Sequence, residues 1–396
     1  MLMKVALISD IHFGKFSRTE ELAVPGCPID DENIGAESLV EGFIDIVKSE
    51  GAEYIFIAGD LTSIASPLEY YYFEDKMMEI SRATGIPIEK IICVTGNHDI
   101  DWNIARLSST LADACVEEKN AEILKAQYQK IAANSAVMNL SVLPQINNGV
   151  APFSGVLVRD EMILFAINTG WFCSPSQDYS HGKLSAEQLV WLETELKKYQ
   201  NDKRTKVFLL HHHPIKYSFP SPVEDISLLE ESSELLDIAG KYGVNLILHG
   251  HRHHPRAQTI QHDDWSNPIS FICAGSLSVN SKHRSNGEIP NTAHIIDFEK
   301  APDSFLLRTY EYSASTGWDL IKRSRPEIPL DSEVWLGKLY QECVFTSTVK
   351  HCLESLTRSV VIFSYDDLPE CLHYMRHKEL NDLFRANVPD GYIISH

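Results

Sequence analysis

Short apolar runs alternate with amphipathic stretches along the chain, and this alternation constrains the fold more than any other feature. Runs rich in β-branched and aromatic residues predict buried strands at Val5–Ser9, Tyr54–Ala58, Ile91–Thr95, Met162–Asn168, Lys206–Leu210, Leu246–Leu248 and Ile269–Cys273. Apolar residues at helical spacing predict helices between them, at Leu39–Ser49, Glu69–Thr84, Ser185–Gln200 and Ser232–Lys241. Strands that alternate with helices in this way indicate an α/β protein with buried strands.

The length of 396 residues allows two to three domains at about 150 residues each. The stretch SRPEIPLD (Ser324–Asp331) carries two prolines and has the character of a boundary. We therefore expect a main domain over residues 1–325, with a helical insertion at about 102–140. Residues 326–396 are expected to form a mainly helical accessory segment, with helices at Ser332–Leu356 and Pro369–Ala386. This C-terminal segment is a candidate for binding a protein partner or for self-association.

The composition predicts a cytoplasmic location. No run of about 18 uncharged apolar residues is present, so we expect no transmembrane helix and no membrane partner. Residues Met1–Asp10 have the character of a first strand, because no small-residue cleavage site of a secretory signal follows them. The eight cysteines are scattered without a CxxC pair, which is typical of reduced thiols.

Five of the predicted strands end in side chains that can bind metal ions. Their ends are SDIH (9–12), AGDLT (58–62), TGNHD (95–99), LLHHHP (209–214) and LHGHRHH (248–254). In an open α/β sheet, ligands bind at the carboxyl ends of the strands. We therefore expect these aspartate, histidine and asparagine side chains to meet in one site.

The chemistry of these side chains favours two divalent metal ions. Carboxylate, imidazole and amide donors without thiolate suit Mn²⁺, Fe or Zn²⁺, and we expect Mn²⁺ first. Two such ions lie about 3.5–4 Å apart and need an anionic bridge. Asp60 is suited to this role, because Gly59 lets the backbone approach closely.

In order and spacing, DIH, GD, GNHD, a histidine at a strand end and GHRH resemble the motifs of the calcineurin-like metallophosphoesterases. The resemblance extends from Val5 to about Phe298. Two further stretches, GDLTSIASPLEY (Gly59–Tyr70) and GKLSAEQLVWLETEL (Gly182–Leu196), are similar to the cyclic-nucleotide-phosphodiesterase-like branch. The resemblance implies two packed mixed β-sheets flanked by helices.

The resemblance also implies a role for each motif residue. It assigns one metal ion to Asp10, His12, Asp60 and His253, and the other to Asp60, Asn97, His212 and His251. His98 is implied as the catalytic residue that faces the leaving-group oxygen. In the HHHP stretch the resemblance favours His212, and His211 is the nearest alternative. Of the other histidines in HGHRHH, we expect His249 and His254 to be wall or surface residues.

The implied activity is hydrolysis of a phosphodiester, either a cyclic nucleotide or another small nucleotide-type substrate. A hydroxide held by both ions would attack phosphorus, and His98 would assist the leaving group. Protein phosphatases of this fold carry the motifs GDxxDRG and GNHE. The corresponding stretches of this sequence, GDLTSIA and GNHDIDW, do not match these motifs.

Two other functions are open at this point. One is a metal-dependent DNA or RNA nuclease, similar to the catalytic subunits of double-strand-break repair complexes, which share DxHxG. The net charge of −20 opposes binding to nucleic acid, although a local basic groove is compatible with it. The other is a non-enzymatic docking module on the same fold, which the complete set of ligand positions disfavours.

Overall fold

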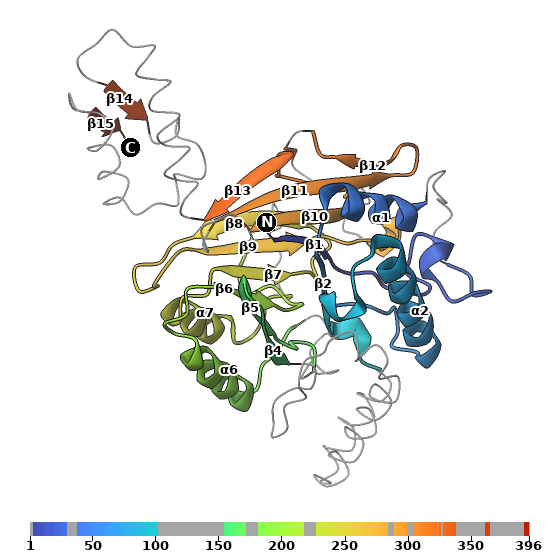
Figure 1. Ribbon diagram of the computed structural model, residues 1–396, viewed down its shortest axis with the longest axis horizontal. Coiled ribbons are helices and arrows are strands. Elements are labelled where there is room, and N and C mark those ends of the chain that lie inside the picture. Colours follow the sequence, from blue (N-terminus) through green and yellow to red (C-terminus); the bar gives the residue numbers. More distant parts are fainter. Residues whose placement is uncertain are drawn as a thin grey trace.

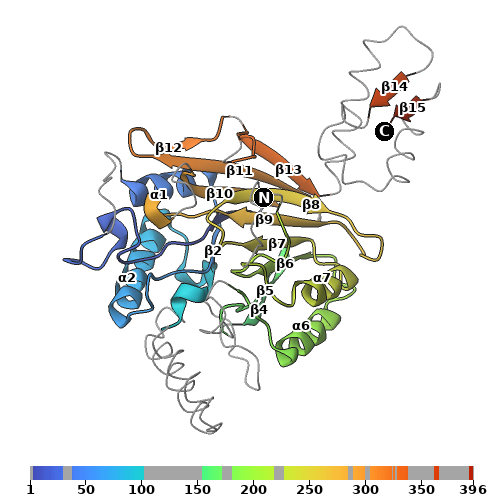
Figure 2. The ribbon, with the colours of Figure 1, turned by 180° about the vertical axis from the view of Figure 1, so that it is seen from behind.

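Two β-sheets pack face to face in the structure, a computed structural model, and helices cover the outer face of each sheet (Figure 1 and Figure 2). The structure describes residues 3–29, 38–101, 154–171, 181–217, 227–283, 289–298, 304–322, 324–325 and 328–337, together with two strands near the C-terminus. The predicted insertion at about 102–140 and most of the predicted segment 326–396 lie outside the described residues.

The first sheet has seven strands, in the order β12-β11-β10-β1-β2-β3, and β13 pairs with β11 as well. Its strands are β1 (Lys4–Ile8), β2 (Tyr54–Ala58), β3 (Ile91–Val94), β10 (Asn291–Phe298), β11 (Ser304–Ser313), β12 (Gly317–Leu320) and β13 (Glu333–Gly337). Strands β1, β2 and β3 are parallel, whereas β10 runs antiparallel to β1. The sheet is therefore mixed.

The second sheet has six strands in the order β4-β5-β6-β7-β9-β8. Its strands are β4 (Gly155–Val158), β5 (Met162–Ala166), β6 (Thr205–Leu209), β7 (Leu246–His249), β8 (Pro255–Ile260) and β9 (Ile269–Ala274). The four central strands are parallel, and the edge strands β4 and β8 are antiparallel to their neighbours. Together the two sheets confirm the predicted fold.

Four α-helices lie in the described ranges: α1 (Leu39–Glu50), α2 (Pro67–Thr84), α6 (Ala186–Lys198) and α7 (Ser232–Lys241). Short 3₁₀ turns occur at Glu20–Leu22, Ile88–Lys90, Asn97–Asp99 and Ser281–His283. The N-cap serine of α1, α2 and α6 accepts a hydrogen bond from the first turn in each case, which satisfies an otherwise unpaired backbone donor. None of the helices in these ranges is long and apolar enough to cross a membrane.

The main core lies between the two sheets. It contains alternate residues of facing strands, such as Val5 and Leu7 of β1 and Val207 and Leu209 of β6. The intervening residues of the same strands pack outward, against α1 and α2 on one side and α6 and α7 on the other (Figure 1). Because the central parallel strands are buried on both faces, they are continuous apolar runs in the sequence.

The C-terminal part differs from the prediction. Residues Glu333–Gly337 lie within the predicted helix Ser332–Leu356, but they form strand β13, which pairs antiparallel with β11. The first sheet therefore continues beyond the predicted boundary at Arg325. Farther along, β14 (Val361–Ser364) pairs in parallel with β15 (Tyr392–Ser395).

Candidate metal centre

The residues predicted to bind metal ions follow the carboxyl ends of β1, β2, β3, β6 and β7. Five positions share a left-handed backbone: φ is 51° at Asp10, 47° at His12, 49° at Asp60, 71° at His251 and 52° at His253. In the described part of the chain, Ala65 is the one other non-glycine residue with a positive φ. This conformation is unfavourable for residues with a Cβ, and such strain clusters at functional sites.

Asp10, His12, Asp60 and His253 form the first donor group. One donor atom from each residue lies within 4.8 Å of the others. His253 Nε2 is 3.1 Å from Asp10 Oδ1, and His12 Nε2 is 3.3 Å from Asp60 Oδ2. Burial raises the pKa of Asp10, but the neighbouring His253 and His211 together outweigh it, so the net shift is downward and favours the carboxylate.

The second donor group contains His211, His212 and His251, again within 4.8 Å, and Asn97 lies beside it. His211 Nδ1 donates a hydrogen bond to the carbonyl oxygen of Ala58 at 2.7 Å, because a carbonyl can only accept. In the neutral ring, Nε2 therefore carries a lone pair. This nitrogen is 3.2 Å from Asn97 Oδ1 and 3.1 Å from His251 Nδ1.

Asp60 joins the two groups. Its Oδ2 is 3.3 Å from His12 Nε2 and 3.2 Å from His211 Nε2. Burial lowers the pKa of His211, but the charges of Asp60 and Asp10 raise it by more, to about 9. Asp60 Oδ2 and Asn97 Oδ1 both lie 3.2 Å from His211 Nε2, so a positive charge at this position, either a proton or a metal ion, stabilises them.

Several buried atoms of the first group lack a hydrogen bond. They are Asp10 Oδ1 and both ring nitrogens of His12. Burial and the nearby His98 lower the pKa of His12 to about 4, so its ring is neutral and can offer a lone pair. Buried polar atoms without partners are rare in native proteins. Divalent cations bind carboxylate and neutral imidazole donors, and they would supply the partners that these buried atoms lack.

Two glycines allow the loops to approach one another at the site. A Cβ at Gly96 would lie 2.2 Å from Asp60 Oδ1, and a Cβ at Gly250 would lie 1.8 Å from Ser9 Oγ. The close approach at Gly250 accompanies a hydrogen bond from the His251 backbone to Asp10 Oδ2 at 3.0 Å. Any larger residue would displace the carboxylates from the donor groups.

His98 lies beside the first group and is partly exposed. Its ring centroid is 4.6 Å from that of His12, and its backbone N–H donates to Asp60 Oδ1 at 2.8 Å. His98 Nδ1 donates to the carbonyl oxygen of Ser63 at 2.9 Å, which leaves Nε2 for other contacts. The ring of Phe16 is edge-on to His98, with a centroid distance of 5.9 Å. The sequence patterns did not single out Ser63 or Phe16.

Asp99 has a structural place in this site. Its carboxylate accepts hydrogen bonds from the backbone N–H groups of Leu61, Thr62 and Gly96, at 3.1, 2.9 and 2.8 Å. Burial and the charge of Asp60 raise the pKa of Asp99 to about 7. The side chain thereby ties the turn after β2 to the turn after β3.

The remaining histidines of the two motifs are buried around the donor groups. His212 Nδ1 is hydrogen-bonded to Thr169 Oγ1 at 2.8 Å. His249 Nε2 is 2.5 Å from the hydroxyl of Tyr217. His249 and His254 are both buried and belong to the wall of the site.

The sequence matches the family described as calcineurin-like phosphoesterase over residues 3–255. The chain belongs to this family. Calcineurin-like phosphoesterases hydrolyse phosphoesters at a centre of two divalent metal ions. Comparison with curated proteins gives no match.

The chain also matches solved structures of two phosphatases and a nucleotidase. A purple acid phosphatase from yellow lupin (Lupinus luteus) has a TM-score of 0.50 and 13% identity, over 86% of this chain and 55% of that one. This chain thus spans about half of that phosphatase. A dimetal phosphatase from Danio rerio has a TM-score of 0.47 and 10% identity, over 85% and 99% of the two chains. An NAD nucleotidase from Haemophilus influenzae has a TM-score of 0.39 and 9% identity, over 81% and 55%.

Proposed function

We propose that this calcineurin-like phosphoesterase is a phosphodiesterase that acts on nucleotide-type substrates, with 3′,5′-cyclic nucleotides foremost. The observation that carries the proposal is the convergence of two donor groups on Asp60 Oδ2, with His98 beside them. The similarity of Gly59–Tyr70 and Gly182–Leu196 to the cyclic-nucleotide branch supports the substrate class. The proposed location of this activity is the cytoplasm.

The donor atoms suggest which residues hold each metal ion. We assign one ion to Asp10, His12, Asp60 and His253, and the other to Asp60, Asn97, His211 and His251. The choice of His212 stays a prediction, and its Nδ1 is hydrogen-bonded to Thr169. The contacts of His211 Nε2 with Asp60, Asn97 and His251 favour His211.

Mn²⁺ is the proposed metal, ahead of Fe and Zn²⁺, because the donors are oxygen and imidazole nitrogen. When bound, two such ions lower the pKa of a coordinated water and polarise the phosphoryl oxygens. Asp60 would contribute a negative charge to both ions. The carbonyl oxygen of Ala58 orients the ring of His211, an arrangement that raises the basicity of an imidazole ligand.

His98 is proposed to act on the leaving group. The hydrogen bond to Ser63 holds its Nδ1, so Nε2 is the atom that would donate a proton to the departing oxygen or stabilise its charge. The ring of Phe16 lies edge-on beside the His98 ring, and the Lys15 ammonium lies 4.9 Å from the centroid of Phe16. An aromatic wall next to an exposed cation is compatible with a nucleobase-bearing substrate.

The experiment is product analysis with Mn²⁺-loaded protein. Cyclic nucleotides, single-stranded and double-stranded oligonucleotides, and a phosphomonoester are offered in parallel to the wild type, to Asp60→Asn and to Asp264→Asn. Asp264 is the matched control, because its side chain is 91% exposed and belongs to neither donor group. We expect the wild type and Asp264→Asn to release nucleoside monophosphate from cyclic nucleotides, and Asp60→Asn to be inactive.

Other outcomes would overturn the proposal. Shortened oligonucleotides with cyclic nucleotides untouched would make the protein a nuclease, the alternative function considered from the sequence. Turnover of the phosphomonoester alone would exclude a phosphodiesterase. Full activity of metal-loaded Asp60→Asn would contradict a centre shared through this carboxylate.

A further inference from the structure

A second cavity lies at the opposite ends of the strands that carry His211 and His251. It has a volume of about 370 Å³. It lies where β6 and β7 begin and where α6 and α7 end, whereas the metal centre lies where β6 and β7 end. Its lining residues are Gln200, Asp202, Lys203, Arg204, Lys206, Lys241, Tyr242, Gly243, Asn245, Ser266 and Asn267. We call it the β6–β7 pocket.

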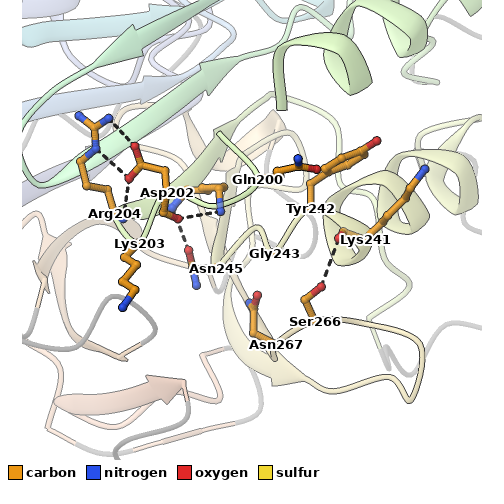
Figure 3. Close-up of a pocket in the computed structure, with 11 residues that line it drawn as sticks. Gln200, Asp202, Lys203, Arg204, Lys241, Tyr242, Gly243, Asn245, Ser266 and Asn267 are labelled. Atoms are coloured by element: carbon orange, nitrogen blue, oxygen red, sulfur yellow. Dashed lines mark hydrogen bonds and ion pairs between the residues drawn. The ribbon is translucent and has the colours of Figure 1, made fainter. Parts of the chain in front are cut away.

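The lining of the β6–β7 pocket contains four cationic residues and one acidic residue, in a protein whose net charge is −20. Two of the cations already have partners. Arg204 is paired with Asp202, with Nη2 2.6 Å from Oδ2 (Figure 3). Lys241 Nζ is 2.7 Å from a carboxylate oxygen of Glu193. Lys241 also lies in the last turn of α7, where a positive charge interacts favourably with the helix dipole. Neither residue requires a ligand.

Lys206 is different. It is the second residue of β6 and only 4% exposed, although lysine is almost never this buried unless it is paired. Its Nζ donates to the carbonyl oxygen of Asp202 at 3.2 Å. Within the described ranges, no carboxylate lies in ion-pair contact with this ammonium, and the Asp202 side chain is bound by Arg204. Burial lowers the pKa of Lys206, and the charge of the nearby Asp202 offsets part of this effect.

The surroundings of Lys206 supply the other elements of a binding site. Lys203 lies on the exposed rim of the same cavity. Figure 3 shows Tyr242 at one side of the cavity and Arg204 with Asp202 at the other, with Gly243 between them. Side-chain amides and a hydroxyl complete the lining, from Gln200, Asn245, Asn267 and Ser266. The cavity thus combines the ammonium groups of two lysines, Lys206 and Lys203, with polar side chains and one aromatic residue.

We propose that the β6–β7 pocket binds a small phosphate monoester, with its phosphate group at the ammonium groups of Lys206 and Lys203. Lysine binds phosphate as a compact point charge, whereas planar carboxylates are matched by the fork of an arginine, and the one arginine here is already engaged. The cavity has room for more than a phosphate group, and the Tyr242 ring offers a surface for the organic part.

The test measures binding by isothermal titration calorimetry on the metal-containing protein. Inorganic phosphate, a nucleoside monophosphate and succinate are titrated at constant ionic strength. The variants are Lys206→Met, Lys203→Gln, Asp60→Asn and the exposed control Lys48→Gln. Lys206→Met replaces a buried charge by an apolar side chain of similar length, and Lys203→Gln changes only the exposed rim. Lys203→Gln keeps the test valid if Lys206→Met fails to fold.

We expect a saturable phosphate site in the wild type, Asp60→Asn and Lys48→Gln. Lys206→Met should weaken this site by about tenfold or more, the loss expected for a hydrogen bond to a charged group, and Lys203→Gln should weaken it several-fold. Phosphate binding that is lost in Asp60→Asn but unchanged in both lysine variants would belong to the metal centre and overturn the proposal. Succinate that binds as tightly as phosphate would overturn the choice of a phosphate ligand. The nucleoside monophosphate should bind more tightly than inorganic phosphate if the organic part is recognised, and equal affinity would restrict the ligand to phosphate itself.

Discussion

At the scale of single residues, the candidate centre depends on which atom of each side chain is free to bind. The motifs identified aspartate, histidine and asparagine at strand ends, and the structure brings seven of these positions and His211 together. The choice between His211 and His212 was beyond the sequence. It depends on the rotation of the chain just after β6, which directs His211 toward Asp60 and His212 toward Thr169.

This choice gives the first prediction. His211→Ala should lose one metal ion per chain. Residues that only support a ligand cost about 10–100-fold in activity when they are replaced, and the loss in His211→Ala should be larger. His212→Ala should keep both ions. Metal analysis of the purified variants, alongside their turnover rates, checks both statements. Retention of both ions in His211→Ala, with loss of one in His212→Ala, would restore His212 as the ligand.

His98 gives the second prediction, because it contacts the leaving group but no metal ion in the proposed mechanism. His98→Ala should keep the metal content of the wild type and lose about 10²–10⁴-fold in turnover, the usual range for general acid catalysis. The loss should be smaller for a p-nitrophenyl ester, whose leaving group needs little protonation. His262→Ala is the control, since this histidine is 60% exposed. An equal loss with good and poor leaving groups would argue against an acid role.

At the scale of elements, the loop between β2 and α2 links helix capping to the position of His98. Ser66 and Glu69 form a capping box at the start of α2. Glu69 Oε2 also accepts a hydrogen bond from the Ile64 backbone at 3.0 Å, and Ile64 follows Ser63, whose carbonyl holds the His98 ring. The cap therefore supports both α2 and the loop between β2 and α2, whose Ser63 carbonyl holds the His98 ring.

The third prediction compares two helix caps. Ser66→Ala and Ser38→Ala each remove an N-cap hydrogen bond, at α2 and α1, and each should lower the free energy of unfolding by about 1 kcal/mol. Only Ser66→Ala should also reduce turnover, because only its loop orients His98. Urea denaturation and steady-state kinetics measure the two effects. Equal activity of both variants would show that the capping box serves stability alone.

The elements also show where prediction from the sequence succeeds. The central parallel strands and the four α-helices in the described ranges were predicted within a few residues, because burial on both faces gives apolar runs and burial on one face gives helical spacing. The antiparallel strands were missed. In β10, the buried His294 interrupts the apolar pattern, and hydrogen bonds to Thr309 and to the Ala274 carbonyl satisfy it. In β13, pairing with β11 overrides the helical pattern of Glu333–Gly337.

At the scale of the whole molecule, the net charge of −20 makes pH a strong influence on stability. Glu50, at the end of α1, connects that helix to strands β1 and β11 of the first sheet. Its carboxylate contacts Lys4 of β1 and Arg308 of β11, each at 3.3 Å, and accepts a hydrogen bond from the Tyr310 hydroxyl at 2.6 Å. Burial raises the pKa of Glu50, but the hydrogen bond from Tyr310 and the charge of Arg308 outweigh it, so the net shift is downward.

The fourth prediction follows from the sign of this shift. A carboxyl group whose pKa is lower in the folded state stabilises the protein above its unfolded pKa, and this contribution disappears as the pH falls through the folded value. Glu50→Gln should therefore be less stable than the wild type at about pH 7, and the difference should shrink steadily below about pH 4.3, the ordinary pKa of glutamate. Urea denaturation of both proteins at a series of pH values from neutral to acidic measures this difference in stability.

The general effect of the negative charge runs in the opposite direction, because protonation of other carboxylates reduces repulsion as the pH falls. The comparison between variants removes this shared effect, since it acts on wild type and Glu50→Gln alike. Glu79→Gln is the control. Glu79 is 54% exposed and paired with Lys76 in the adjacent turn, so the stability of this variant should follow that of the wild type at every pH. A wild-type advantage over Glu50→Gln that stays constant down to acidic pH would mean that Glu50 stabilises the protein by packing and not by its charge.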